Sequence, residues 1–186
     1  MTLGVAAYIL GKQGVNYALS YCTDESSRIS SFTSGPSHLE ELLGSYRKAI
    51  ECGTPKQSFY DTLLNSAAIF SRHMIMIIIT DAEGLAEMDA GLIKRLIYYN
   101  DVYIFKIEDA LLTATDVYDL DADDYVDPFL AMCRDLYREE VKLKEDLDKK
   151  AEKLLTPHRI FFKSISKEEE IVDTLIYLFR RRKGIT

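Results

Sequence analysis

The residue with the clearest chemical potential is Asp81, which follows directly on an apolar run. Residues 74–79 read MIMIII without a polar break, and Thr80 and Asp81 come next. A short continuous run of this kind predicts a strand buried on both faces, and open α/β sheets place their sites at the carboxyl ends of such strands. A carboxylate there, with hydroxyl oxygens from a neighbouring loop, offers the hard oxygen ligands that Mg²⁺ or Mn²⁺ prefers. The simpler interpretation, a polar residue that ends a strand and caps the next helix, is narrowly favoured by these residues alone.

A second source of carboxylates is the acidic stretch 109–127. The run DLDADD that starts at Asp119 invites comparison with a calcium-binding EF-hand loop. However, Asp124 stands where that loop needs glycine, and Leu130 stands where it needs a bidentate glutamate. We therefore interpret the stretch as a solvated acidic loop, whose last member, Asp127, caps a long helix.

The composition and the absence of common motifs narrow the function classes. The formal net charge of −7 and the pI of about 5.0 argue against a nucleic-acid surface. No stretch approaches the ~20 apolar residues of a membrane span, so we expect no membrane contact by this segment. The three cysteines form no CxxC pair, which favours a reducing, cytoplasmic location, with a membrane anchor elsewhere in a parent protein left open. Motifs for phosphate loops, dinucleotide binding, zinc proteases and serine hydrolases are absent from the sequence.

The elements that would position Asp81 alternate between strands and helices. The expected strands cover residues 15–22, 28–33, 74–80, 102–107 and 159–162. The expected helices cover residues 2–12, 37–52, 57–71, 85–96 and 128–155, and a last helix is capped by Ser166. On the longest helix, the apolar stripe that should face the sheet includes Leu136, Leu143 and Leu147. We predict one α/β domain over residues 1–186, with a doubly wound, mostly parallel sheet of about five strands and helices on both faces.

The order of elements and several short motifs resemble a known family. The matching residues are Gly4 to Tyr8 with Gln13 and Gly14, Val15 to Tyr21, His38 and Leu39 with Leu42 and Leu43, Ile77 to Asp81, Val126 and Asp127, Tyr137, and Leu178 to Arg182. Together they resemble the von Willebrand factor A-like domain of a large bacterial and archaeal family. Members of that family are often encoded near MoxR-type AAA+ ATPases.

The resemblance implies a doubly wound sheet with strand order 3-2-1-4-5-6 and a metal ion-dependent adhesion site. In that family the site uses a DxSxS motif after strand one, a Thr from a later loop and an Asp after strand four. Asp81 matches the last position, and the middle position falls between Thr54 and Ser58. The resemblance therefore makes Asp81, Thr54 and Ser58 the candidate ligands of an incomplete site for Mg²⁺ or Mn²⁺, and it implies no other cofactor.

The DxSxS motif itself is missing. The sequence DESSR at residues 24–28 is similar in spelling only, because it lies in an expected hairpin turn. The chain begins inside the first helix, so strand one, which should lie between strands two and four, would be absent. The chain is then an N-terminally truncated fragment, receives the strand from another chain, or has closed without it and lost the site. We favour the fragment, and in each case Asp81 alone leaves most ligand positions to water.

The function implied by the resemblance is a non-enzymatic protein–protein interaction module. Its partner would be a protein, with a MoxR-type AAA+ ATPase as the specific candidate, in the assembly or maturation of other proteins. The alternative is a divalent-metal-dependent enzyme that uses Asp81 and the acidic stretch 109–127. Titration with Mg²⁺ or Mn²⁺ distinguishes the two, because a metal site at Asp81 would change thermal stability in the native protein and not in Asp81→Ala.

Overall fold

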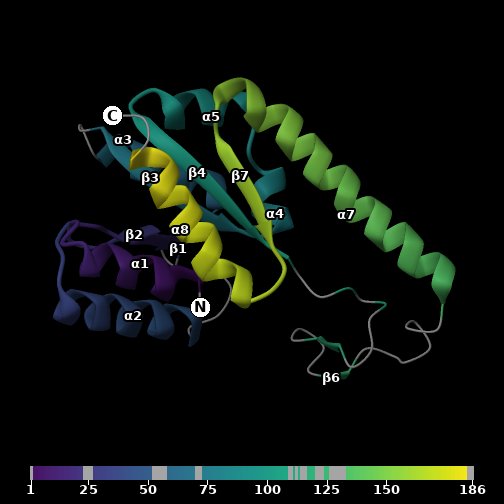
Figure 1. Cartoon of the computed structure of the whole chain (residues 1–186), viewed down its shortest axis with the longest axis horizontal. Helices are drawn as coiled ribbons and strands as arrows, with labels where there is room; N and C mark the ends of the chain where they lie inside the picture. Colours follow the sequence, from purple (N-terminus) through teal and green to yellow (C-terminus); the bar gives the residue numbers. More distant parts are fainter. Residues whose placement is uncertain are drawn as a thin grey trace.

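The protein folds as a small parallel sheet covered by helices, with a separate hairpin beside it (Figure 1). The computed structural model describes residues 2–22, 27–51, 58–69, 73–108, 111, 113, 117–119, 124–125 and 133–183. The helices are α1 (Thr2–Lys12), α2 (Pro36–Glu51), α3 (Phe59–Ile69), α4 (Ala82–Ala86), α5 (Ala90–Ile97), α7 (Arg134–Leu155), the 3-10 helix η1 (Thr156–His158) and α8 (Glu169–Lys183). The strands are β1 (Ser20–Cys22), β2 (Ser27–Ile29), β3 (Met74–Thr80), β4 (Asn100–Ile107), β5 (Tyr118–Asp119), β6 (Asp124–Tyr125) and β7 (Phe161–Ile165).

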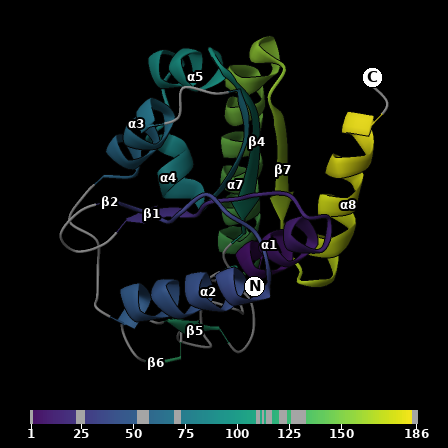
Figure 2. The same ribbon diagram turned by 90° about the vertical axis from the view of Figure 1, so that its left-hand side faces the viewer.

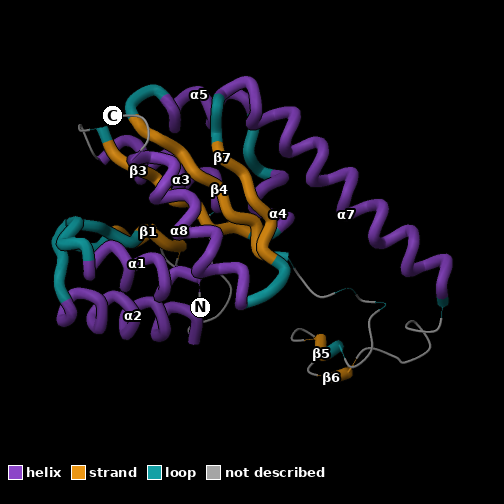
Figure 3. The backbone as a smooth tube through the Cα atoms, viewed as in Figure 1, coloured by secondary structure: helices purple, strands orange, loops and turns teal. Residues whose placement is uncertain are grey.

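The parallel sheet has the order β3-β4-β7, with β4 in the middle (Figure 3). Strand β3 pairs with β4 from Met74 opposite Asn100 to Thr80 opposite Lys106. Strand β7 pairs with the other side of β4 and ends at Ile165. All three strands therefore end at the same edge of the sheet, and the predicted boundaries of β3 are confirmed.

Helices cover both faces of this sheet (Figure 2). On one face, α3, α5 and the end of α7 pack on β3 and β4, around side chains such as Leu92 and Leu96 that have no exposed surface. On the other face, α1 and α8 pack on Phe105, and Leu175 of α8 is also fully buried. The predicted α/β class with helices on both faces is confirmed.

The hairpin of β1 and β2 is antiparallel and forms its own two-stranded sheet. It lies against α3 through side chains: the Ser20 and Ser66 hydroxyls are 2.7 Å apart, and Cys22 Sγ is 3.0 Å from Thr62 Oγ1. Within the described residues, no backbone pairing joins β1 to β3. The strands are shorter than the expected ranges 15–22 and 28–33, because only an isolated bridge between Tyr17 and Thr33 extends them.

Two helices differ from their predictions. The helix expected over residues 85–96 is divided into α4 and α5, because Asp89 accepts a hydrogen bond from Leu92 N–H and starts a new helix. The long helix α7 is described from Arg134, and the predicted cap at Asp127 lies outside the described residues.

The expected apolar stripe on α7 is wrong at its amino end. Leu136 is 41% exposed and Leu143 is 62% exposed, whereas Ala151 and Leu155 near the other end are buried. Figure 1 shows the cause, since the amino-terminal half of α7 extends beyond the sheet. An apolar periodicity predicts which face of a helix could be buried, but it does not say how far the neighbouring sheet reaches.

Candidate functional site

Asp81 lies at the carboxyl end of β3, where it begins α4. Its backbone is extended, and its Oδ1 accepts a hydrogen bond of 2.8 Å from Gly84 N–H. This is the geometry of a helix N-cap. A Cβ atom at Gly84 would overlap the hydroxyl oxygen of Thr80, so the glycine allows the turn to close tightly on the end of β3.

Of the other two candidate ligands, the structure describes only Ser58. Ser58 precedes α3, where its Oγ accepts from Asp61 N–H at 3.1 Å and donates to Asp61 Oδ2 at 3.0 Å. Thr54 lies outside the described residues. No group of three or more His, Cys, Asp or Glu residues in the described part of the chain is arranged to hold a metal. Asp81 and Ser58 both line one large cavity.

This cavity, of about 1120 Å³, lies between β3 and the hairpin. Every residue of β3 lines it, and so do all residues of β1 and parts of α1, α2 and α3. Its walls are mainly apolar, with contributions such as Leu19, Leu42 and Leu63. We call this space, together with the edge of β3 that faces it, the β3 groove.

The β3 groove changes the interpretation of the apolar run 74–79. We expected a strand buried on both faces at the sheet centre, but only Ile78 and Thr80 of β3 are buried. Ile75, Ile77 and Ile79 keep part of their surface accessible. The reason is that, among the described strands, β3 pairs with β4 on one side only, and its other side borders the cavity.

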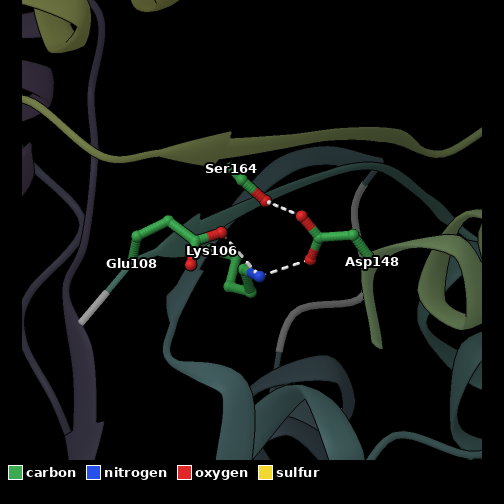
Figure 4. A network of polar contacts seen from close by, with 4 residues as sticks. All are labelled: Lys106, Glu108, Asp148 and Ser164. Carbon is green, nitrogen blue, oxygen red and sulfur yellow. Dashed lines mark hydrogen bonds and ion pairs between the residues drawn. The ribbon is translucent and has the colours of Figure 1, made fainter. Parts of the chain in front are cut away.

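A cluster that the sequence analysis did not identify lies at the ends of β4 and β7 (Figure 4). Lys106 is only 2% exposed, and its Nζ forms ion pairs with Glu108, at 2.6 Å, and with Asp148 of α7. Ser164 of β7 donates its hydroxyl proton to Asp148 Oδ2 at 3.0 Å. The cluster therefore fastens the middle of α7 to two strands of the sheet.

The electrostatics of the cluster favour the protonated form of Lys106. Burial alone would lower the pKa of Lys106, but hydrogen bonds and charge attraction from Asp148 and Glu108 outweigh burial and raise that pKa above its ordinary value. A lysine that acts as nucleophile or base must lose its proton, and this environment keeps the proton bound. A cavity of about 330 Å³ adjoins the cluster, and Ser166 lines it together with Glu108, Asp148 and Ser164. We interpret Lys106 as a structural residue.

One sequence signal could have found this cluster. Lys106 interrupts the otherwise apolar strand Val102 to Ile107, and lysine is almost never fully buried unless it is paired. The identity of the partner could not have been read in the same way. Asp148 is 42 residues away, on a helix with many other charged side chains.

Among the described helices, none combines the length and the apolar character needed to cross a membrane. Comparison of this chain with protein-family models, with curated proteins and with solved structures found no match.

Proposed function

We propose that this chain is a non-enzymatic protein-interaction module with a von Willebrand factor A-like fold, and that it binds its partner at the β3 groove. The observation that carries the proposal is the side of β3 that pairs with no other described strand and borders a large, mainly apolar cavity. Such a site is typical of binding to another polypeptide, since a strand edge offers backbone donors and acceptors as well as apolar surface.

The apolar residues of β3 would gain stabilisation from further burial. Burial contributes about 25 cal/mol for each Å² of apolar surface removed from water. In the isolated chain, Ile75, Ile77 and Ile79 line the cavity and are only partly buried. Part of this stabilisation is therefore not realised. A protein that fills the groove would gain this burial, and it would also supply partners for backbone groups of β3.

The arrangement of strands supports the resemblance to the von Willebrand factor A-like family. In the family order 3-2-1-4-5-6, β2 and β1 would correspond to strands three and two, and β3, β4 and β7 to strands four, five and six. The β3 groove then falls at the position of strand one, between β1 and β3. This correspondence is the reason to keep a MoxR-type AAA+ ATPase as the candidate partner.

The test uses the intact protein and the purified MoxR-type ATPase that is encoded nearest to it. The protein is immobilised, and binding of the ATPase is measured by interferometry without nucleotide, with ADP and with a non-hydrolysable ATP analogue. We expect saturable binding in at least one nucleotide state. Absence of binding in all three states would reject the ATPase as partner.

A further inference from the structure

We propose that the long helix α7 binds α7 of a second copy of this chain, side by side and antiparallel. The contact surface is a line of four leucines along α7, which we call the α7 leucine line: Leu136, Leu143, Leu147 and Leu154. The occupant of this surface is the same chain, so the assembly is a twofold symmetric dimer.

The α7 leucine line has the spacing of a coiled-coil seam. Leu136 lies one heptad before Leu143, and Leu147 lies one heptad before Leu154, with four residues from Leu143 to Leu147. Apolar side chains at this spacing form one stripe on a helix and insert between the side chains of a second helix. At 1.5 Å per residue, the stripe extends over about 27 Å.

The α7 leucine line is not the face of α7 that packs on the sheet. Ala151 and Leu155 are buried in the core beside the sheet, and Asp148 forms the ion pair with Lys106. Because successive residues of a helix are rotated by about 100°, these positions lie about a quarter of a turn away from the leucines. The ion pair therefore fixes the rotation of α7 about its axis and directs the leucine line to the side.

The exposure of the leucines shows where a second helix can bind. Leu143 is 62% exposed and Leu136 is 41% exposed, whereas Leu147 and Leu154 are partly buried. Exposure increases toward the amino end of α7, which extends beyond the sheet (Figure 1). In an antiparallel pair, the exposed end of each leucine line lies against the partly buried end of the other. The pair would remove apolar surface from water at about 25 cal/mol for each Å².

Two charged residues lie within the seam and indicate its direction. Glu140 and Lys150 occupy the heptad positions that the leucines leave open. In an antiparallel pair in which Leu143 faces the partner's Leu147, Glu140 faces the partner's Lys150. Twofold symmetry repeats both contacts. The two outer leucines also face each other in this register, so that each apolar position meets an apolar one and each charge meets its opposite.

The same residues disfavour a parallel pair. There each seam position faces its own copy, so that Glu140 would face the partner's Glu140 and Lys150 would face the partner's Lys150. Like charges at such a contact repel, and this repulsion helps to select the antiparallel arrangement. Beside the seam, Glu139 faces the partner's Lys153 in the antiparallel register and adds a further pair of opposite charges.

Glu140 is held in position by the chain that precedes α7. Its Oε2 accepts hydrogen bonds from the N–H of Thr113, at 3.1 Å, and from the hydroxyl of Thr113, at 2.7 Å. A carboxylate can accept further hydrogen bonds, and a side chain that is already fixed loses less conformational entropy on binding. On the twofold axis, Lys144 and Asp146 each face their own copies, which weakens the pair. We therefore expect a dissociation constant on the order of 10 µM.

The first experiment measures self-association of the intact protein by sedimentation velocity from about 1 to 500 µM. We expect monomer at the lower end of this range and dimer at the upper end. Leu143→Lys places a charge in the middle of the seam at a mostly exposed position, so the fold should tolerate it. We expect its dimerisation to be at least tenfold weaker. The matched control is Val172→Lys, on α8 and 44% exposed, which should dimerise like the native protein.

The second experiment tests the antiparallel register through charge exchange. Lys150→Glu places a carboxylate opposite Glu140 in both halves of the dimer and should weaken it roughly tenfold. Adding Glu140→Lys exchanges the two charges and should restore the native dissociation constant. In a parallel pair, like charges face each other before and after each change, so neither effect would occur. Lys142→Glu, the same charge change at an exposed position away from the seam, is the control.

A second exchange avoids Glu140, whose replacement also removes the hydrogen bonds from Thr113. Lys153→Glu should weaken the dimer by about threefold, and adding Glu139→Lys should restore it. Both side chains are exposed, so these variants should keep the native fold.

Four results would overturn the proposal. The first is a native protein that stays monomeric up to 500 µM, a limit set by roughly fifty times the expected dissociation constant. The second is dimerisation of Leu143→Lys as strong as that of the native protein. The third is a dimer that Ile75→Lys disrupts and Leu143→Lys does not, which would place the contact at the β3 groove. The fourth is failure of both charge exchanges to restore a weakened dimer, which would reject the antiparallel register.

Discussion

Strands β3 and β4 are neighbours in one sheet, and they differ in what surrounds them. Both are rich in isoleucine and other apolar residues, and they run parallel in register over the whole of β3. Strand β4 has a strand on each side, and its Ile104 and Phe105 have no exposed surface. Strand β3 has the groove on one side, and most of its residues are only partly buried.

The two strands also end differently. Near the end of β4, Lys106 forms ion pairs with Glu108 and with Asp148 of α7, and Asp148 also accepts a hydrogen bond from Ser164 of β7. Strand β3 ends at Asp81, whose hydrogen bond to Gly84 is local and serves only the start of α4. Strand β4 is thus enclosed and anchored within the fold, whereas β3, among the described strands, has backbone pairing on one side only.

The largest expected effect on the free energy of unfolding comes from truncating one isoleucine in each strand. Ile104→Ala in β4 should lower the free energy of unfolding by about 4 kcal/mol, because a fully buried side chain is removed and a cavity remains. Ile75→Ala in β3 should cost only about 1 kcal/mol, since this side chain is partly accessible already. Urea denaturation measures both values, and equal costs would contradict the difference between the strands.

The second-largest effect on the free energy of unfolding is expected on removal of the positive charge near the end of β4. Lys106→Met should lower the free energy of unfolding by about 3 kcal/mol, because Glu108 and Asp148 lose their buried cation. The control is Lys149→Met, since Lys149 is 60% exposed and its ion pair with Glu145, at 3.2 Å, should contribute no more than about 0.5 kcal/mol. Similar losses from the two variants would show that the cluster does not fasten α7.

A pH titration tests the same cation without relying on a single stability value. The pKa of Lys106 is raised in the folded state, so the stability it contributes is fully present below the unfolded pKa of about 10.4. This contribution is lost as the pH rises through the folded pKa. Burial also raises the pKa of Tyr17, but that effect is present in both proteins and cancels in their difference.

The stability difference between the native protein and Lys106→Met should therefore stay constant up to about pH 10 and shrink above it. Urea denaturation at successive pH values measures this difference. A difference that stays constant throughout the alkaline range would mean that Lys106 is not bound more tightly to its proton in the folded state.

The smallest effect is expected at the end of β3. Asp81→Ala should cost about 1 kcal/mol through loss of the cap on α4, whereas Asp81→Asn should cost little, because asparagine caps helices as well as aspartate does. A metal ligand would behave differently, since the amide of asparagine lacks the negative charge. Thermal melts of the three proteins with and without Mg²⁺ separate the roles, and a metal-dependent rise in melting temperature confined to the native protein would support the metal site.

Helices and strands were predicted well where the local sequence pattern is strong. The boundaries of β3 and α1 match the expected ranges 74–80 and 2–12, because a continuous apolar run and a helical periodicity are each carried by neighbouring residues. The division between α4 and α5 was missed, although the cap at Asp89 was visible, because the apolar spacing continues across it. An apolar periodicity that continues across a helix break favours the prediction of one long helix over two short ones.

What could not be predicted depends on contacts between distant residues. The partial burial of Ile75 and Ile77 follows from the missing neighbour of β3 within the described chain, and their own sequence looks like that of a central strand. The pairing of Lys106 with Asp148 likewise depends on where α7 crosses the sheet. For the candidate site, the sequence located Asp81 at the end of β3 correctly, but the groove beside it required the three-dimensional arrangement.

The separation of the two sheets has a mechanical consequence. In the described structure, the β1–β2 hairpin is held to α3, which packs on the parallel sheet, by side-chain contacts such as that of Ser20 with Ser66, and no backbone hydrogen bonds join the two sheets. A pulling force across this junction would meet a soft connection that opens at low load.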